Sequence, residues 1–324
     1  MPPVAAAAAG AVCISSSAVL MKLASTASPS VVALGRCAFA LPVLGALALR
    51  ERRRGSGTMP MPSRSRWLAR LAGVFLAADL ILWSHTIAAI GAGLGTVVGN
   101  LEVLIIALLA WLVLGERPSR SLVLAFPVML AGLVLVGGLA DTGSSHAYGT
   151  DPALGVGLGV GVAVLYAVYI LMLRQATPAG PDAAVAAPLF EATAGGVVGS
   201  VLLGLVLGDL RLGPPWPALG WLALLALTSQ VIGWLLITVS MPRLAAGTIG
   251  ALLLIQPAGS VALSYVILGE RPSLLQLAGV ALMLTGVVVA VTGRAPEVPY
   301  SRRRTRIIRH ASAASTGTSP SKSP

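Results

Sequence analysis

The sequence predicts an all-α membrane protein of ten transmembrane helices, arranged as two inverted repeats of five helices each. Three observations support this fold class. The chain has 324 residues, of which 56% are hydrophobic and only 10% are charged, whereas a water-soluble domain carries about 25% charged residues. The hydrophobic residues gather in runs of about twenty, the length of a membrane-spanning helix. The pentapeptide Gly-Glu-Arg-Pro-Ser occurs twice, at residues 115–119 and 269–273, and each copy separates two such runs.

The separation of 154 residues between the two pentapeptides also relates other identical residues. The triplet Trp-Leu-Ala occurs at residues 67–69 and again at 221–223, and Gly93 matches Gly247. A constant offset across several apolar segments indicates that the chain contains two copies of one hydrophobic unit.

The expected spans follow from the apolar runs, since about 20 residues cross the roughly 30 Å hydrocarbon core. In the first repeat they are Val4–Ala24, Ser30–Leu49, Trp67–Ala89, Gly95–Leu114 and Ser121–Leu139. In the second repeat they are Ala153–Leu173, Ala183–Leu207, Trp216–Ser240, Ala245–Leu268 and Leu274–Thr292.

Turn-forming and polar segments separate these spans. Ser28-Pro29 follows the first span, a basic loop over residues 50–66 follows the second, and Gly91 and Gly93 mark a turn after the third. No basic segment precedes the first apolar run, so a cleaved signal peptide is not expected.

The longest polar break in mid-chain, residues 140–152, predicts the boundary between the repeats. We therefore expect a first repeat over residues 1–140 and a second over 153–293. Residues 294–324 are rich in arginine, serine and threonine, and we expect them to form a disordered basic tail.

The placement of lysine and arginine predicts the orientation, because cytoplasmic loops carry an excess of both. With a cytoplasmic N-terminus, that side collects all but four of the 22 basic residues, the exceptions being Lys22, Arg36, Arg211 and Arg271. Both termini are then expected in the cytoplasm, in a multi-pass protein of the cell (inner) membrane. Five spans per repeat invert the second repeat relative to the first, an architecture found in many secondary transporters.

Two carboxyl groups fall near the middle of expected spans, where ionisable side chains are costly and therefore informative. These are Asp79 in the third span and Glu102 in the fourth. Glu102 and Gln256 are equivalent under the 154-residue offset, and Pro257 is expected to open the ninth span at that level. Asn100 lies about 200° around a regular helix from Glu102, so we expect only Glu102 to face a cavity.

Helical spacing places further polar and aromatic residues on shared faces. The faces are Asp79-Trp83-Thr86, Gln230-Trp234-Thr238, Gln256-Ser260-Ser264 and the pair Tyr166-Tyr169. If they converge, they form a pocket that binds substrate through Trp83, Glu102, Tyr166, Gln230, Trp234 and Gln256, and takes up a coupling proton at Asp79 or Glu102. The alternative for the serines and threonines is ordinary helix packing, and for the two tryptophans it is contact with lipid or neighbouring helices.

Three further ionisable residues are weaker candidates. Arg36 is expected too near the outer face to bind a ligand in the cavity. At that place it would snorkel or pair with a carboxylate. His85 is expected at the interface or in packing, and Glu191 as a lone carboxyl group on the seventh span.

The sequence does not have the motifs of soluble enzymes. It has no phosphate-binding glycine loop with a lysine, no histidine–cysteine metal cluster and no Gly-x-Ser-x-Gly elbow. Neither catalysis nor a cofactor or metal is therefore expected, and Cys13 and Cys37 are interpreted as isolated thiols. The basic clusters lack interleaved aromatic residues, which argues against nucleic acid. The expected partners are a small-molecule substrate and the bilayer, with anionic lipid at the basic loop and tail; a homodimer is compatible with the sequence.

The chain resembles the EamA-type members of the drug/metabolite transporter superfamily from about Ala5 to Thr292. The segment from Gln256 to Val289, QPAGSVALSYVILGERPSLLQLAGVALMLTGVVV, is the most specific part, and WLVLGERPS and ALGRCAFALPVL in the first repeat also match. The resemblance implies a ten-helix transporter that works by alternating access, with a cavity lined mainly by the third, fourth, eighth and ninth helices and completed by the first and sixth. It also implies export of small metabolites or drugs, often driven by protons. The family often has a proline where this chain has Val103.

The function expected from these observations is proton-coupled export of a small organic metabolite or drug. One alternative is exchange of an anionic or phosphorylated metabolite, which needs a cationic group at midplane depth that the sequence does not indicate. The other is a membrane scaffold or sensor that acts through the basic tail.

Overall fold

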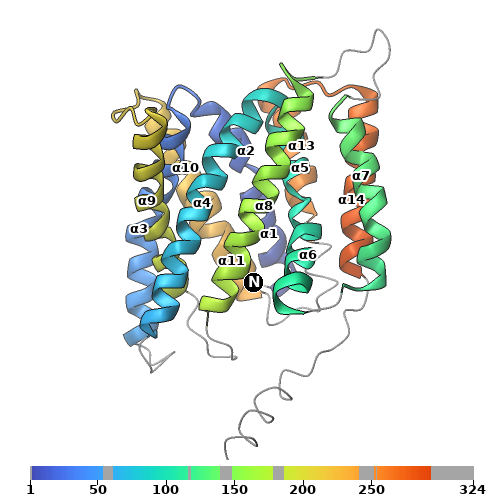
Figure 1. The fold of residues 1–324 in the computed structure, drawn as a ribbon. Helices are drawn as coiled ribbons and strands as arrows, with labels where there is room; N and C mark the ends of the chain where they lie inside the picture. The colour runs from blue at the N-terminus through green and yellow to red at the C-terminus, as the bar shows by residue number, and fades with distance from the viewer. Residues whose placement is uncertain are drawn as a thin grey trace, which may run out of the picture. The chain divides into compact units, whose positions relative to one another are not determined.

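The computed structural model describes residues 2–53, 61–115, 118–138, 148–177, 186–240, 252 and 254–292, which form helices and connecting turns without any β-strand (Figure 1). In chain order the helices are α1 (Pro3–Ser15), α2 (Ser17–Leu23), α3 (Pro29–Arg53), α4 (Ser63–Ile90), α5 (Ala92–Gly99), α6 (Glu102–Leu114), α7 (Arg120–Val136), α8 (Pro152–Ala176), α9 (Ala186–Leu207), α10 (Ala218–Leu225), the π-helix η1 (Ala226–Gly233), α11 (Trp234–Ser240), α13 (Ile255–Leu268) and α14 (Leu274–Thr292).

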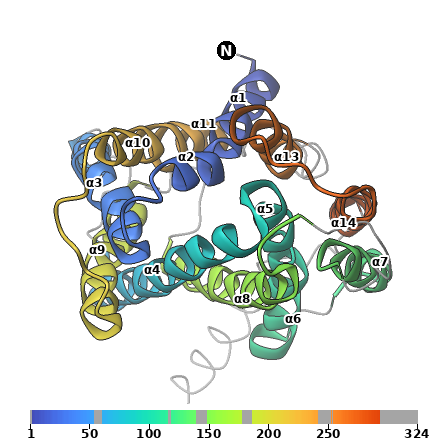
Figure 2. The same ribbon diagram turned by 90° about the horizontal axis from the view of Figure 1, so that it is seen from above.

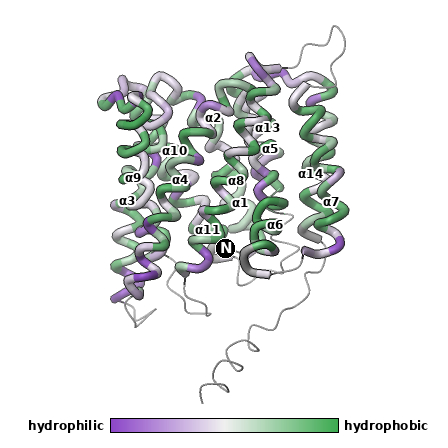
Figure 3. The backbone as a smooth tube through the Cα atoms, in the orientation of Figure 1, coloured by the Kyte–Doolittle hydropathy of each residue, from purple (hydrophilic) through white to green (hydrophobic). Residues whose placement is uncertain are grey.

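Within these residues, seven helical stretches are long and apolar enough to cross a membrane, and α7, α13 and α14 are shorter apolar helices. In Figure 3, hydrophobic residues run along the helices and the strongest hydrophilic colour gathers toward their ends. The described helices lie close to the expected spans, although the first half of the ninth span, from Ala245, falls mostly outside the described residues.

Within the described residues, three expected spans are not single α-helices. The first is divided at Ser16, and the fourth at Asn100 and Leu101. The eighth runs through the π-helix η1 between α10 and α11. The periodicity of apolar residues predicts where a helix runs. A short turn between two helices, or the wider turns of a π-helix, hardly alters that periodicity, so the sequence does not show them.

Helices of the two repeats interleave rather than forming two separate bundles. In the first repeat α4 packs against α8 and α9 of the second, α3 packs against α9, and α1 packs against η1, α11 and α13 (Figure 2). Much of the close helix packing therefore lies between the repeats, so each repeat stabilises the other.

Equivalent helices of the two repeats pack in antiparallel pairs. On α7 and α14, a Cβ atom at Gly132 would approach the carbonyl oxygen of Gly279 to 2.7 Å, and one at Gly286 would lie 3.4 Å from that of Ala125. These two contacts are equivalent under the 154-residue offset. α3 and α9 also run antiparallel, since a Cβ atom at Gly45 would meet Phe190 at one end of the pair, and one at Gly204 would meet Ser30 at the other.

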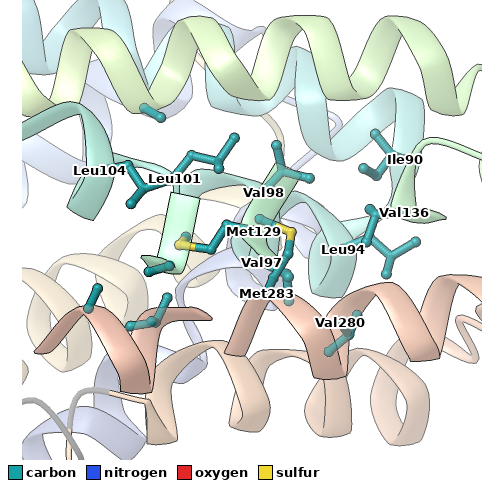
Figure 4. Packing of buried hydrophobic residues seen from close by; sticks show 14 of the residues in the cluster. Ile90, Leu94, Val97, Val98, Leu101, Leu104, Met129, Val136, Val280 and Met283 are labelled. Atoms are coloured by element: carbon teal, nitrogen blue, oxygen red, sulfur yellow. The ribbon is translucent and has the colours of Figure 1, made fainter. Parts of the chain in front are cut away.

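A hydrophobic cluster holds the α7–α14 pair against α5. Val97, Met129 and Met283 meet near its centre, and Leu94 and Val280 extend it (Figure 4). All five side chains are less than a tenth exposed. This cluster fixes the position of α5, on which one wall of the site depends.

Glu270 of the second pentapeptide links the repeats at one end of the molecule. Its carboxylate accepts hydrogen bonds from the backbone N–H groups of Ala92 (2.7 Å) and Gly93 (3.1 Å), and its side chain is 1% exposed. It therefore caps the N-terminus of α5, where N–H groups have no partner within the helix. Gly91 precedes α5 with φ 92°, a backbone conformation that favours glycine, and so lets the Glu270 carboxylate come close to the start of α5. Burial, together with the nearby Glu270, raises the pKa of Tyr148.

The sequence predicts a terminal hydrogen-bonding role for both pentapeptide glutamates. Glu270 performs this role, but on a helix of the other repeat; Glu116 lies outside the described residues. The fully buried Gln276 adds a second link that the sequence did not indicate. Its Nε2 donates to the carbonyl oxygens of Val136 (3.2 Å) and Tyr148 (3.1 Å).

The close approach of α4 and α9 predicts an asymmetric response to glycine substitution. A Cβ atom at Gly73 would overlap the backbone oxygen of Ala192, which cannot move aside, whereas one at Gly157 meets nothing within 4 Å. We expect Gly73→Val to lower stability by about 1–3 kcal/mol or more and Gly157→Val to leave it nearly unchanged. Thermal unfolding of the two variants in detergent measures this, and equal melting temperatures would show that the α4–α9 contact is wrong.

Candidate functional site

A cavity of about 240 Å³ lies between helices of both repeats. Its polar and aromatic lining comes from Ser17, Arg36, Asp79, Trp83, Thr96, Asn100, Glu102, Tyr166, Trp234 and Gln256. These residues belong to α2, α3, α4, α5, α6, α8, α11 and α13, or to the turn between α5 and α6. Of the seven residues predicted to bind substrate or take up a proton, the structure brings six to this cavity: Asp79, Trp83, Glu102, Tyr166, Trp234 and Gln256.

The interruption between α5 and α6 shapes one wall of this cavity. Asn100 and Leu101 have φ values typical of an α-helix, but their ψ values of −7° and −18° are well above the helical value of about −42°. The chain therefore forms a tighter turn at these two residues. The Asn100 side chain donates to the carbonyl oxygen of Thr96 at 2.8 Å, which gives a main-chain acceptor at the interruption a partner. No proline is needed; Gly99-Asn100, two poor helix formers, are the local sequence signal.

The expectation that Glu102 faces the cavity without Asn100 is wrong, because both residues line it. The prediction assumed a continuous helix. The interruption offsets α6 from α5 (Figure 2), so side chains two residues apart reach the same space.

The second repeat places Gln256 in a matching position. Glu102 is the first residue of α6 and Gln256 the second residue of α13, so each lies in the first turn of its helix. Pro257 also lies in this turn, where its missing N–H leaves no hydrogen bond unmade. It lies where α13 begins; most of the ninth span before it lies outside the described residues, so the opening of this span at Pro257 stays a prediction. Both residues lie at helix N-termini, whose partial positive charge favours acidic and polar side chains.

Asp79 enters the cavity from the middle of α4. Its side chain is 4% exposed, and its Oδ1 atom has no hydrogen-bond partner among the described residues. Trp83, one turn further on, lines the same space. Thr86 does not; its hydroxyl group donates to the carbonyl oxygen of Leu82 at 3.0 Å.

Arg36 was expected outside the cavity, nearer the outer face. It lies on α3, lines the cavity and is only 7% exposed. Its Nε donates to Oε1 of Gln230 at 3.1 Å. Gln230 was predicted to contact substrate; it does not line the cavity and instead holds Arg36 from η1. The apolar neighbours on both sides of Arg36 gave no signal that it lines a cavity, because its partner Gln230 lies 194 residues away in the chain.

The model of the EamA-like transporter family matches residues 1–138 and 153–292, the two sequence repeats. The chain belongs to the EamA-like transporter family. It is accordingly a multi-pass membrane transporter of the drug/metabolite superfamily, built from two repeats, and the family is not enzymatic.

Other comparisons bear on the fold alone. No curated protein matches the chain. A solved structure described only as the crystal structure of a protein aligns over 92% of this chain and 98% of its own, with a TM-score of 0.58 and 18% identity. This identity is too low to carry function.

The remaining candidate residues of the transporter divide into lining and packing groups. Tyr166 and Trp234 line the cavity, whereas Tyr169 is buried behind Tyr166, with ring centroids 5.5 Å apart. The Ser260 hydroxyl lies 2.9 Å from that of Thr96, and Ser264 bonds within its own helix. These two serines serve helix packing, as in the alternative interpretation; the side chain of Thr238 lies outside the described residues.

Two of the weaker candidate residues, Glu191 with its carboxyl group and His85 with its imidazole ring, lie away from the cavity. Glu191 is not a lone group, since its Oε2 atom forms an ion pair with Nε of Arg70 at 2.7 Å. The sequence did not pair them because they lie in different repeats, on α9 and α4. His85 is exposed on α4 and does not line the cavity.

The cavity predicts selective reaction of introduced cysteines. In a background with Cys13 and Cys37 replaced by alanine, we expect Glu102→Cys to react with a small water-soluble thiosulfonate, because position 102 lines the cavity. Leu104→Cys, two residues along the same helix, should stay unmodified, because Leu104 is 5% exposed within the hydrophobic cluster. Mass spectrometry after timed labelling measures both. Equal reactivity at the two positions would contradict the cavity wall described above.

Proposed function

We propose that this EamA-type transporter moves a small organic solute across the cell membrane by alternating access, in exchange for protons. The observation that carries this proposal is the cavity, with Asp79 and Glu102 in its wall and the turn between α5 and α6 and the beginning of α13 at its edge. In secondary transporters, binding sites at midplane depth are typically formed where such helices are interrupted.

The antiparallel packing of α7 with α14 and of α3 with α9 supports a fold of ten membrane helices in two inverted repeats, over residues 1–140 and 153–293. In this topology both termini lie in the cytoplasm. The basic loop 50–66 and the tail 294–324 then face anionic lipid on that side.

In the proposed mechanism Asp79 and Glu102 carry the coupling proton. A carboxyl group enclosed by protein in a membrane is costly as an anion, so uptake and release of a proton can be linked to which side the cavity faces. Gln256 and Asn100 would hydrogen-bond the solute, while Trp83, Trp234 and Tyr166 would pack on its apolar part.

The alternative of anion exchange gains support from Arg36. That function was placed second because no cationic group was expected at the right depth, and Arg36 lines the cavity. Two carboxyl groups share the same space, however, and favour proton-coupled transport. The scaffold alternative depends on the tail, which lies outside the described residues.

The coupling proposal predicts the behaviour of two conservative variants. We expect Asp79→Asn, Glu102→Gln or both to lower proton-driven solute exchange in reconstituted vesicles by at least tenfold, about 1.4 kcal/mol in barrier height. Glu191→Gln is the matched control, since it neutralises a carboxyl group paired with Arg70 away from the cavity. Full gradient-driven exchange in both cavity variants would refute the assignment.

A further inference from the structure

The two repeats meet along α5 and α13, between the cavity and one end of the molecule (Figure 2). Thr96 of α5 lines the cavity, and its hydroxyl oxygen lies 2.9 Å from that of Ser260 on α13. Closer to the start of α5, a Cβ atom at Gly93 would overlap the hydroxyl oxygen of Ser264. At the start itself, the Glu270 carboxylate accepts hydrogen bonds from the first two N–H groups of the helix, at 2.7 and 3.1 Å. The contact therefore extends from the cavity wall to the end that carries the second pentapeptide.

The two packed sides of α5 differ in chemistry. Leu94 and Val97 are fully buried in the hydrophobic cluster with Met129 and Met283 of α7 and α14. The contacts with α13 described above instead join a glycine, a threonine and two serines, which bury little apolar surface. Because hydrophobic stabilisation scales with the apolar area buried, the α5–α13 contact is the weaker of the two. Its strongest single interaction is the one made by the carboxylate, since a hydrogen bond to an ionised acceptor is about twice as strong as a neutral one.

Glu270 is attached to the end of α13. Its backbone N–H donates to the carbonyl oxygen of Ser264 at 3.2 Å, and Gly269 before it ends the helix with φ 67°. No ion pair within 4.0 Å holds the Glu270 carboxylate in the described part of the chain. A shift of α13 away from α5 would therefore carry the carboxylate with it, and water would replace each partner of the broken hydrogen bonds. The contact can open without leaving a polar group unpaired.

We propose that Glu270 is a gating residue of the transport cycle. Its hydrogen bonds to α5 hold the cavity closed toward the end that carries the second pentapeptide, and their release opens the cavity to that side. We call this contact the α5–α13 seal and define it by Ala92, Gly93, Thr96, Ser260, Ser264 and Glu270. The inference rests on the proposed function, because alternating access requires a seal on each side of the membrane that can open in turn.

The physical consequence of losing the carboxylate differs between the closed and the open form. In the closed form, the N–H groups of Ala92 and Gly93 would be buried without an acceptor, which is costly. In the open form, water satisfies both groups. Removal of the carboxylate therefore raises the free energy of the closed form more than that of the open form, and the population shifts toward the open form. A cap with a structural role only would lower stability without exposing the cavity.

A cysteine in the cavity wall reports this opening. Ser17 lines the cavity, is 2% exposed, and its Oγ atom has no hydrogen-bond partner among the described residues, so a cysteine of similar size fits there. In the full-length protein without Cys13 and Cys37, Ser17→Cys is treated in sealed vesicles with an impermeant thiosulfonate from one side at a time. Arg271→Cys, at an exposed position and in a separate variant, identifies the side that carries the second pentapeptide. Mass spectrometry measures the labelling rate.

We expect Glu270→Ala to raise the labelling rate from that side about tenfold or more, because the rate follows the population of the open form. Glu270→Gln keeps one acceptor but loses the other and the charge, and should raise the rate less. Asp209→Ala is the matched control. Asp209 is also a carboxylate of the second repeat that caps a helix of the first, accepting from the N–H of Ser30 at 3.3 Å, but it does not touch the α5–α13 seal. Its loss should leave the rate unchanged.

A second pair of variants tests the seal without altering Glu270, and keeps the test decisive if the Glu270 variants fail to fold. A Cβ atom at Gly93 would overlap the Ser264 hydroxyl oxygen and lie 3.0 Å from the Cα atom of Val261, so Gly93→Ala should push α13 away and raise the labelling rate. Gly95→Ala is the same substitution on the same helix, where the nearest atom is a methyl carbon of Thr86 at 3.4 Å, and it should not. An unchanged rate in folded Glu270→Ala or, failing that variant, in Gly93→Ala overturns the inference. An equal rise in the matched controls also overturns it.

The outcome is separable from that of the proposed function, because labelling requires neither a substrate nor a proton gradient. Labelling that rises as expected, with no proton-driven solute exchange by the unmodified protein, would retain the seal and reject the proposed proton exchange. Proton-driven exchange that depends on Asp79 or Glu102, with labelling unchanged by Glu270→Ala, would retain the transporter and reject Glu270 as its gating residue.

Discussion

The structure depends on one constraint: within a bilayer, the polar groups of a non-helical backbone must find partners inside the protein. Three irregular segments in the described part of the chain follow that rule. The turn at Asn100, the beginning of α13 and the π-helix η1 all border the cavity or hold a residue that does. Asn100 gives Thr96 a side-chain donor at the break. Polar side chains gather where helices are interrupted because lipid is excluded there.

Interleaving of the repeats is what excludes lipid from this region. α4 lies between α8 and α9 of the other repeat, with contacts so close that Gly73 and Gly195 have no space for a side chain. Glu270 then joins the end of one repeat to the beginning of α5 in the other. Asp79 on α4 and Asn100 after α5 are therefore held by elements that the opposite repeat positions.

Much of the fold follows from the sequence because it depends on length, apolarity and one offset. The runs of apolar residues locate the helices, and the offset of 154 residues predicts that Glu102 and Gln256 occupy matching places. Asp79, Trp83 and Trp234 could be found because midspan polar and aromatic residues are rare in such a chain. These features need no knowledge of how helices pack.

The errors concern which side chains line the cavity and where helices are interrupted, and both depend on packing between distant segments. Arg36 and Gln230 are 194 residues apart, and no local pattern shows that they form a hydrogen bond. The pair Arg70 and Glu191 is hidden for the same reason. Asn100 was excluded from the cavity by assuming a regular helix, and only the turn in the folded chain brings it there. The local sequence around a polar side chain with apolar neighbours is the same whether that side chain faces a cavity or another helix, so the sequence does not separate the two cases.

The central claim, that two antiparallel repeats enclose the cavity, is tested most directly by labelling equivalent positions from each side of the membrane. Arg120 and Leu274 begin α7 and α14, are related by the 154-residue offset and are both exposed. In sealed vesicles, and in a background without Cys13 and Cys37, single cysteines at these positions can be treated with an impermeant maleimide. The account predicts that one position is labelled from outside and the other only after the vesicles are opened. Labelling of both from the same side would contradict it.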